Sequence, residues 1–203
     1  MHYNHPFITT PDTFYALWSD IPVRVNSEDD RLFQQTGHAT TYGYLTPLGF
    51  LRLLDAYTMH HPKHAYPKVF YDIGSGLGMP CVLAVSLLPK LEAHGIELSH
   101  ERHQNAKTVR NKLPQPVRKR LHLHNVDALH YKKYSDADMI YISNLCFPEH
   151  HSQAIGTILT KQLRPGTHVF TSRPLVTLEH SFEQVFNVPQ SWQQSSQVFH
   201  YIV

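Results

Sequence analysis

The sequence predicts an α/β domain built on an open, mostly parallel sheet. From residue 69 onward, short apolar or β-branched runs alternate with segments of helical periodicity, as in sheets whose strands are joined by crossover helices. One such run, residues 69–73, ends in the alternating glycines Gly74, Gly76 and Gly78, and the next run ends in Glu97. At 203 residues, 41% of them apolar, the chain is long enough to bury one core and short for two.

The parallel strands and their helices follow in chain order. We expect strands at residues 69–73, 91–96, 121–125, 138–143 and 168–172. Residues 80–88 continue the glycine turn with apolar spacing that is compatible with a helix. The next helix is capped by Ser99 and stopped by Pro114, and the one after the fourth strand begins at Pro148 and ends before the Pro-Gly pair at residues 165–166.

The two ends of the chain complete the predicted fold. Strand-like runs at residues 184–188 and 197–203 predict an antiparallel hairpin. Five parallel strands followed by such a hairpin form the seven-stranded, Rossmann-like sheet of class I methyltransferases, and this is the fold class we predict. The first 68 residues are less regular apart from a helix at residues 47–59 capped by Thr46. We interpret residues 1–68 as an N-terminal helical lid and residues 69–203 as the cofactor-binding core.

The glycine turn and the carboxylate after it are typical of a nucleotide-type cofactor site. Glycines let a ligand approach bare backbone, and an acidic residue at the end of the next strand is placed to bind ribose hydroxyls. Asp72 directly precedes the turn, where its charge would repel a diphosphate and attract an ammonium group. This favours S-adenosylmethionine over a dinucleotide, although glycines at such a turn also occur for packing alone. The predicted cofactor-binding residues of this stretch are Asp72, Gly74, Ser75, Gly76, Gly78 and Glu97.

Two more strand ends carry candidate site residues. Asp127 and Ala128 follow the third strand, where a carboxylate faces the adenine amino group in methyltransferase sheets or, equally, caps a helix. The fourth strand ends in a stretch with Ser143, Asn144 and Phe147, which places polar and aromatic groups at the carboxyl edge of the sheet. Aromatic walls exclude water and favour a sulfonium or methylammonium cation, so we expect the methyl acceptor there.

In these and further segments the chain resembles the non-SET histone lysine methyltransferases named for disruption of telomeric silencing. The similar segments are residues 41–44 (the family's Tyr-Gly-Glu motif), 72–78 (its glycine loop), 95–97 (its ribose-binding strand end), 143–147 (its Asn-Asn-Phe-Ala-Phe motif), 171–175 (its Ser-Ser-Lys-Pro-Phe motif) and 191–201 (its Ser-Trp and paired tyrosines). The resemblance spans residues 41–203. Tyr44 stands where the family has a cofactor-contacting Glu, and Ser143 stands where it has the first Asn.

The resemblance implies an S-adenosylmethionine-dependent protein lysine N-methyltransferase. It implies that Tyr42 joins the cofactor site, and that an apolar lysine channel is formed by Phe147, Trp192 and Phe199, with Ser143 or Asn144 accepting a hydrogen bond from the amine. A small-molecule or RNA methyltransferase on the same fold, or a non-catalytic cofactor binder, remains an alternative. The sequence stops at Val203 without the basic tail with which those enzymes hold nucleosomal DNA, so a nucleosome is not the substrate we expect.

Composition sets the remaining expectations. The net charge of +2 gives no reason to expect a nucleic-acid partner, and two cysteines without disulfide or metal spacing indicate free thiols in a reducing compartment. With no signal-peptide pattern and no run of eighteen apolar residues, we expect an intracellular, cytoplasmic protein without membrane contact. We interpret the 17 histidines as surface composition rather than a metal site, because none of their clusters is accompanied by cysteines or carboxylates nearby in the sequence. Net charge should therefore climb between about pH 7 and pH 5.

Overall fold

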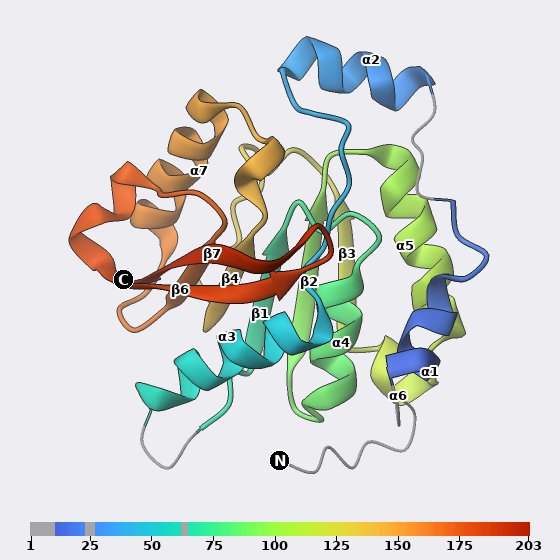
Figure 1. Ribbon diagram of the computed structural model, residues 1–203, viewed down its shortest axis with the longest axis horizontal. Coiled ribbons are helices and arrows are strands. Elements are labelled where there is room, and N and C mark those ends of the chain that lie inside the picture. The colour runs from blue at the N-terminus through green and yellow to red at the C-terminus, as the bar shows by residue number, and fades with distance from the viewer. Residues whose placement is uncertain (1–10, 23–26, 62–64) are drawn as a thin grey trace.

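A seven-stranded sheet forms the centre of the computed structural model, which describes residues 11–22, 27–61 and 65–203. The strand order is β3-β2-β1-β4-β5-β7-β6 (Figure 1). The parallel strands are β1 (Val69–Ile73), β2 (Glu92–Glu97), β3 (Leu121–Asn125), β4 (Met139–Ile142) and β5 (His168–Thr171), and the antiparallel ones are β6 (Phe182–Gln190) and β7 (Gln193–Ile202). The predicted fold class is confirmed. The hairpin strands are longer than expected. The added residues at the start of β7, 193–196, are polar and mostly exposed, so they lack the apolar signal of a strand.

Helices cover both faces of the sheet. Consecutive residues of a strand are buried on opposite faces. On one face, the core includes Phe70 together with side chains of α3 (Pro47–Met59), α4 (Met79–Leu87) and α5 (His100–Lys112). On the other face, Tyr71 belongs to a core with side chains of α7 (Glu149–Gln162) and the short helix η4 (Val176–Ser181). The predicted caps are confirmed: the Thr46 hydroxyl accepts from Gly49 N at 3.1 Å, and the Ser99 hydroxyl accepts from Arg102 N at 3.0 Å. A single turn, α6 (Gln115–Arg118), follows α5, and no helix of the described residues is long and apolar enough to cross a membrane.

The N-terminal segment contains more helix than the sequence indicates. Beside α3 it holds α1 (Pro11–Tyr15), the turn η1 (Ala16–Trp18) and α2 (Ser27–Thr36), a largely polar helix. Trp18 Nε1 donates to Leu77 O at 3.0 Å, which fixes η1 against the core. Asp29 of α2 accepts from His100 N at 3.2 Å and from the Ser99 hydroxyl, so it caps α5 from outside the helix. Residues 1–10, 23–26 and 62–64 of the expected lid lie outside the described residues, and the boundary at residue 68 remains a prediction.

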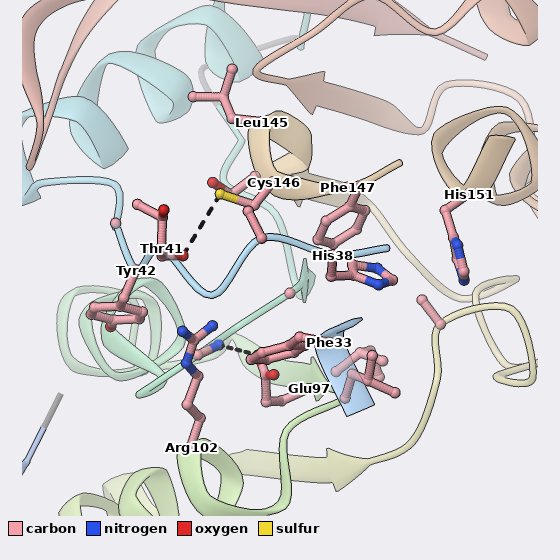
Figure 2. Close-up of a pocket in the computed structure, with 18 of the residues that line it drawn as sticks. Phe33, His38, Thr41, Tyr42, Glu97, Arg102, Leu145, Cys146, Phe147 and His151 are labelled. Carbon is pink, nitrogen blue, oxygen red and sulfur yellow. Dashed lines mark hydrogen bonds between the residues drawn. The ribbon is translucent and has the colours of Figure 1, made fainter. Parts of the chain in front are cut away.

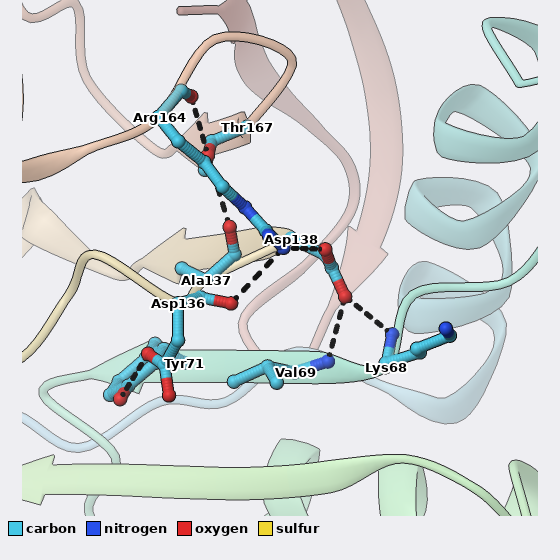
Figure 3. A network of polar contacts seen from close by, with 8 residues as sticks. All are labelled: Lys68, Val69, Tyr71, Asp136, Ala137, Asp138, Arg164 and Thr167. Atoms are coloured by element: carbon cyan, nitrogen blue, oxygen red, sulfur yellow. Dashed lines mark hydrogen bonds and ion pairs between the residues drawn. The ribbon is translucent and has the colours of Figure 1, made fainter.

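A polar network fixes the amino-terminal edge of the sheet (Figure 3). Asp138, directly before β4, accepts from Lys68 N at 2.7 Å and Val69 N at 3.0 Å, and it forms an ion pair with Arg164 beyond α7. Nearby, the Tyr71 hydroxyl contacts Asp136 Oδ1 at 2.9 Å. Because this network ties the start of β1 to the start of β4, it sets the register that brings their carboxyl ends together at the opposite edge.

Part of the histidine content is buried, which corrects the interpretation as surface composition. His168 on β5 and His200 on β7 are 1% and 0% exposed, and His200 Nε2 lies 2.9 Å from His168 Nδ1. Burial, with the neighbouring histidines, lowers the pKa of His168 to about 3 and, chiefly through burial, that of His200 to about 4. Histidines of this kind stay neutral in the folded protein at pH values where free histidine is charged.

We expect this pair to make the fold acid-sensitive. The folded pKa values lie below the unfolded value of about 6.5, so the unfolded chain takes up protons first and stability is lost as pH falls below about 6.5. The loss should be roughly 1–3 kcal/mol per pH unit between about pH 6 and pH 5, since each neutral buried histidine contributes up to about 1.4 kcal/mol per unit. Urea unfolding at a series of pH values measures this slope. His200→Gln should flatten it, and an unchanged slope would contradict the assignment.

Candidate functional site

A cavity of about 490 Å³ lies at the carboxyl edge of the parallel strands (Figure 2). Four parts of its wall follow parallel strands: the glycine turn after β1, the end of β2, residues 126–128 after β3 and the segment 143–147 after β4. The first turns of α7 and residues of the N-terminal segment 33–43 line it as well. Trp192, in the turn between β6 and β7, is also part of the wall. This is the edge at which open parallel sheets bind ligands.

The glycine turn has a backbone conformation that other residues rarely adopt. Gly74, Gly76 and Gly78 have φ values of 79°, 54° and 76°. A Cβ atom on Gly76 would lie 2.4 Å from the Tyr42 ring, and one on Gly74 would lie 2.9 Å from the Phe147 ring. The turn is therefore glycine-rich both for its positive φ angles and because aromatic side chains of the cavity wall approach it closely.

Glu97 lies where the sequence predicts a ribose-binding carboxylate. Its Oε2 accepts from Gly76 N at 2.7 Å and its Oε1 accepts from Ser99 N at 2.8 Å, so it bridges the glycine turn and the start of α5. The side chain lines the cavity and is 5% exposed. Burial raises the pKa of this carboxyl, while the hydrogen bond from Ser99 and the charge of Arg102 act in the opposite direction.

Three other predicted cofactor residues lie behind the wall. Asp72, Ser75 and Gly78 are not among the described residues that line the cavity. Asp72 is 1% exposed, with Oδ2 4.0 Å from the sulfur of Cys81 in α4, and burial followed by repulsion from Glu97 raises its pKa well above the ordinary value. The structure thus places Asp72 beneath the glycine turn, and a contact from it to the ammonium end of a cofactor remains a prediction.

The residues after β3 also belong to the cavity wall. Asp127 and Ala128 both line the cavity, and Asp127 Oδ1 also accepts from Leu129 N at 2.9 Å. The alternative interpretation of Asp127 as a helix cap is wrong, because the described residues between β3 and β4 form a turn and no helix. Asp127 Oδ2 lies 3.8 Å from Nε2 of His151, a buried residue whose ring nitrogens have no hydrogen-bond partner among the described residues. His38 packs against His151 with ring centroids 4.6 Å apart, and burial and His151 lower the pKa of His38 to about 4.

The structure brings together three of the five predicted acceptor residues in the cavity wall. Ser143, Phe147 and Trp192 all line the cavity. Trp192 covers Gly43, where a Cβ atom would lie 2.2 Å from the indole ring, and the flanking Ser191 hydroxyl accepts from Tyr44 N at 3.0 Å. The segment around Gly43 therefore docks on the β6–β7 turn and holds the indole over the cavity.

The other two predicted acceptor residues lie elsewhere. The Asn144 side chain is fully buried and holds the backbone after β5, accepting from Arg173 N at 2.8 Å and donating to Arg173 O at 3.3 Å. Phe199 lines a different cavity of about 280 Å³ beside Leu175 and Tyr201. The structure does not bring Phe199 into the main cavity, because its position on β7 directs it to the core shared with α7.

Several wall residues are absent from the sequence prediction. Arg102 of α5 lies with its guanidinium carbon 5.0 Å from the centre of the Phe33 ring and 5.4 Å from that of Tyr42. Figure 2 shows the Arg102 side chain between these two rings. Tyr42 was expected in the site and lines it, whereas Phe33, His38, Arg102 and His151 were not. The sequence signals were weak: His150 and His151 open a helix, and Arg102 stands three residues after a helix cap.

The strand order, with β7 antiparallel between β5 and β6, and the glycine-walled cavity at the carboxyl edge define the class I S-adenosylmethionine-dependent methyltransferases. Within this class, the chain belongs to the family described as histone methylation protein DOT1, whose model matches residues 23–198.

Solved structures agree on the fold. The glycopeptide N-methyltransferase MtfA has a TM-score of 0.59 at 14% identity, over 90% of this chain and 99% of that chain. The methyltransferase domain of bacterial CtHen1-CN has a TM-score of 0.57 at 15% identity, over 75% of this chain and 95% of that chain. MtfA complexed with S-adenosylmethionine has a TM-score of 0.50 at 15% identity over 74% of this chain, which spans 65% of that chain's length. No curated protein matches the sequence.

Proposed function

We propose that the protein binds S-adenosylmethionine and transfers its methyl group to the ε-amine of a lysine in a protein. The observation that carries the proposal is one cavity whose wall contains Glu97 and the glycine turn together with Trp192, Phe147 and Ser143. Its volume of about 490 Å³ falls in the range of roughly 300–1,000 Å³ typical of small-molecule sites. Membership of the histone methylation family and the S-adenosylmethionine bound to MtfA support the cofactor and a protein substrate.

The proposed cofactor pose follows from the chemistry of the walls. Glu97 accepts from the ribose hydroxyls, and the backbone of Gly74 and Gly76 lies against the amino-acid end. Adenine lies between the wall at Ala128 and the rings of Phe33 and His38, with Asp127 accepting from its amino group. Phe33 faces the charge of Arg102, which fixes the ring as one side of the adenine slot.

Methyl transfer at a sulfonium needs positioning more than acid–base chemistry. The lysine nitrogen forms a bond to the methyl carbon as the bond from carbon to sulfur breaks. The products are S-adenosylhomocysteine, whose sulfur is uncharged, and a methyllysine whose nitrogen is protonated. The chain's contribution is to align the amine, exclude water and favour its neutral form. Trp192 and Phe147 supply the apolar walls, and the Ser143 hydroxyl accepts a hydrogen bond from the attacking amine.

Mass spectrometry tests the proposal directly. The protein, with any tag removed, is incubated with S-adenosylmethionine carrying a deuterated methyl group and, in parallel, with free histones, nucleosomes, lysine peptides and RNA. We expect labelled lysine in a protein or peptide, and much less of it when Glu97→Ala replaces the wild type at a cofactor concentration that does not saturate the variant. Label confined to RNA would favour the RNA methyltransferase, and binding of S-adenosylhomocysteine without transfer to any acceptor would favour a non-catalytic binder.

The rate should rise with pH if lysine is the acceptor. A lysine must lose its proton before it attacks, and its ordinary pKa is about 10.4, so the rate should increase roughly tenfold per pH unit until the pKa of the bound amine is reached. Single-turnover rates with a lysine peptide between about pH 7 and pH 9.5 measure this. A flat profile would argue against a lysine acceptor while leaving cofactor binding untouched.

A further inference from the structure

Histidines and a glutamate gather on the two strands β2 and β3 at one edge of the sheet, outside the cavity. Glu92 and His94 are two residues apart on β2, and His122 and His124 are two residues apart on β3, so each pair faces one side of its strand. The register pairs His94 with His122, which places all four side chains on the same face. Glu92 stands two residues before His94 in the sequence, and strand pairing brings His122 beside them, so this histidine group does have a carboxylate nearby.

The distances within this group are those of a loose metal site. One ligand atom each from Glu92, His94 and His122 lies within 4.8 Å of the others. Glu92 Oε2 lies 3.6 Å from His122 Nε2. Zinc bound to nitrogen and oxygen at about 2.0–2.2 Å in a tetrahedron separates its ligand atoms by roughly 3.3–3.5 Å. Small rotations of the partly exposed side chains are enough to close the group around an ion.

Ring packing holds the histidines in place for such a role. The His94 ring stacks on His122, with centroids 4.7 Å apart and planes at 21°, and on its other side on Tyr71 at 4.6 Å and 17°. His94 Nδ1 also lies 3.3 Å from His124 Nε2. A hydrogen bond to a second histidine is the kind of contact that orients a metal-binding imidazole.

One of the candidate ligand nitrogens has no competing partner in the part of the chain that the structure describes. A neutral imidazole with a free nitrogen lone pair is the form that binds metal ions. His122 Nε2 is buried and has no hydrogen-bond partner among the described residues.

We propose that Glu92, His94 and His122 bind a zinc ion, with His124 as a positioning residue for the His94 ring. Two imidazoles and one carboxylate favour zinc or a similar late transition metal over magnesium or calcium, which prefer oxygen ligands. Three protein ligands on a partly exposed surface leave a fourth position for water. The site is separate from the proposed methyl transfer and does not depend on it.

Calorimetric titration of the intact protein with Zn²⁺, after removal of any polyhistidine tag, tests the site. We expect one saturable site, with affinity at least tenfold weaker in Glu92→Gln and in His122→Gln. His180→Gln removes an exposed histidine of η4 and should leave the affinity unchanged, which separates this site from general binding by surface histidines. No saturable site in the wild type, or equal affinity in all variants, would overturn the proposal.

Co²⁺ in place of Zn²⁺ gives a second readout. A four-coordinate site should produce the intense visible absorption of tetrahedral cobalt in the wild type and lose it in His122→Gln. Binding of S-adenosylhomocysteine by the same variants reports whether β2 is folded, because Glu97 ends that strand. A variant that keeps this binding and also keeps the cobalt spectrum would contradict the assignment of His122.

Discussion

Glu97→Ala should weaken binding of S-adenosylhomocysteine by roughly tenfold to a hundredfold. Losing a hydrogen bond to a charged partner costs about 1.5–3 kcal/mol, and Glu97 has a second role because it bridges Gly76 N and Ser99 N. Without the carboxylate, both backbone donors lose their acceptor and the glycine turn loses its tie to α5. Calorimetry on wild type and variant measures the change.

Two further variants make this measurement specific. Asp55→Ala removes an exposed carboxylate of α3 outside the cavity and should leave the affinity unchanged. Glu97→Gln keeps the shape and one acceptor oxygen, so its affinity should fall between those of wild type and Glu97→Ala. Tight binding by a well-folded Glu97→Ala protein would contradict the proposal that Glu97 binds the ribose.

Trp192→Ala should lower the single-turnover rate on the order of a hundredfold, while cofactor affinity changes no more than about threefold. Trp192 is 40% exposed, so its removal leaves only a small cavity in the fold, but it takes away the wall that we propose aligns the acceptor. An interaction used for alignment is lost mainly from the rate. The rate, the affinity and the melting temperature are measured on the same preparations.

Phe199→Ala is the matched control for the tryptophan. Phe199 lies in the other cavity and packs against the core shared with α7, so the variant should lose about 2–3 kcal/mol of stability with the rate of the folded fraction preserved. An unchanged rate in Trp192→Ala, or a large loss of rate in folded Phe199→Ala, would reverse the two assignments.

The sheet could be predicted from the sequence because its signals are local. The strand at residues 69–73, the caps Thr46 and Ser99, and the stop at Pro114 each depend on a few neighbouring residues, and all are confirmed within a residue or two. The place of α2 in the fold could not be predicted in this way, because its Asp29 contacts the start of α5, which is remote in the sequence.

Local sequence signals predict the site where one strand end supplies the residue, and the family resemblance adds Tyr42 and Trp192. Glu97 and the glycines are set by strand β1, strand β2 and the turn between them. Arg102 and His38, by contrast, reach the cavity through packing between segments about sixty residues apart, as the bond from Arg102 to Thr40 O shows. Phe199 was misplaced for a related reason: adjacent residues of a strand face opposite sides, and the resemblance alone did not fix which side faces the cavity.

The contacts of Ser99 join two parts of the molecule that are remote in sequence. Its backbone N–H donates to Glu97, while its hydroxyl donates to Asp29 of α2. The position of α2 and the position of the Glu97 carboxylate are therefore coupled, because both depend on hydrogen bonds to Ser99. Affinity for the cofactor can then be tuned, in nature or by design, through substitutions in α2 that never contact the ligand, leaving the chemistry of the cavity wall unaltered.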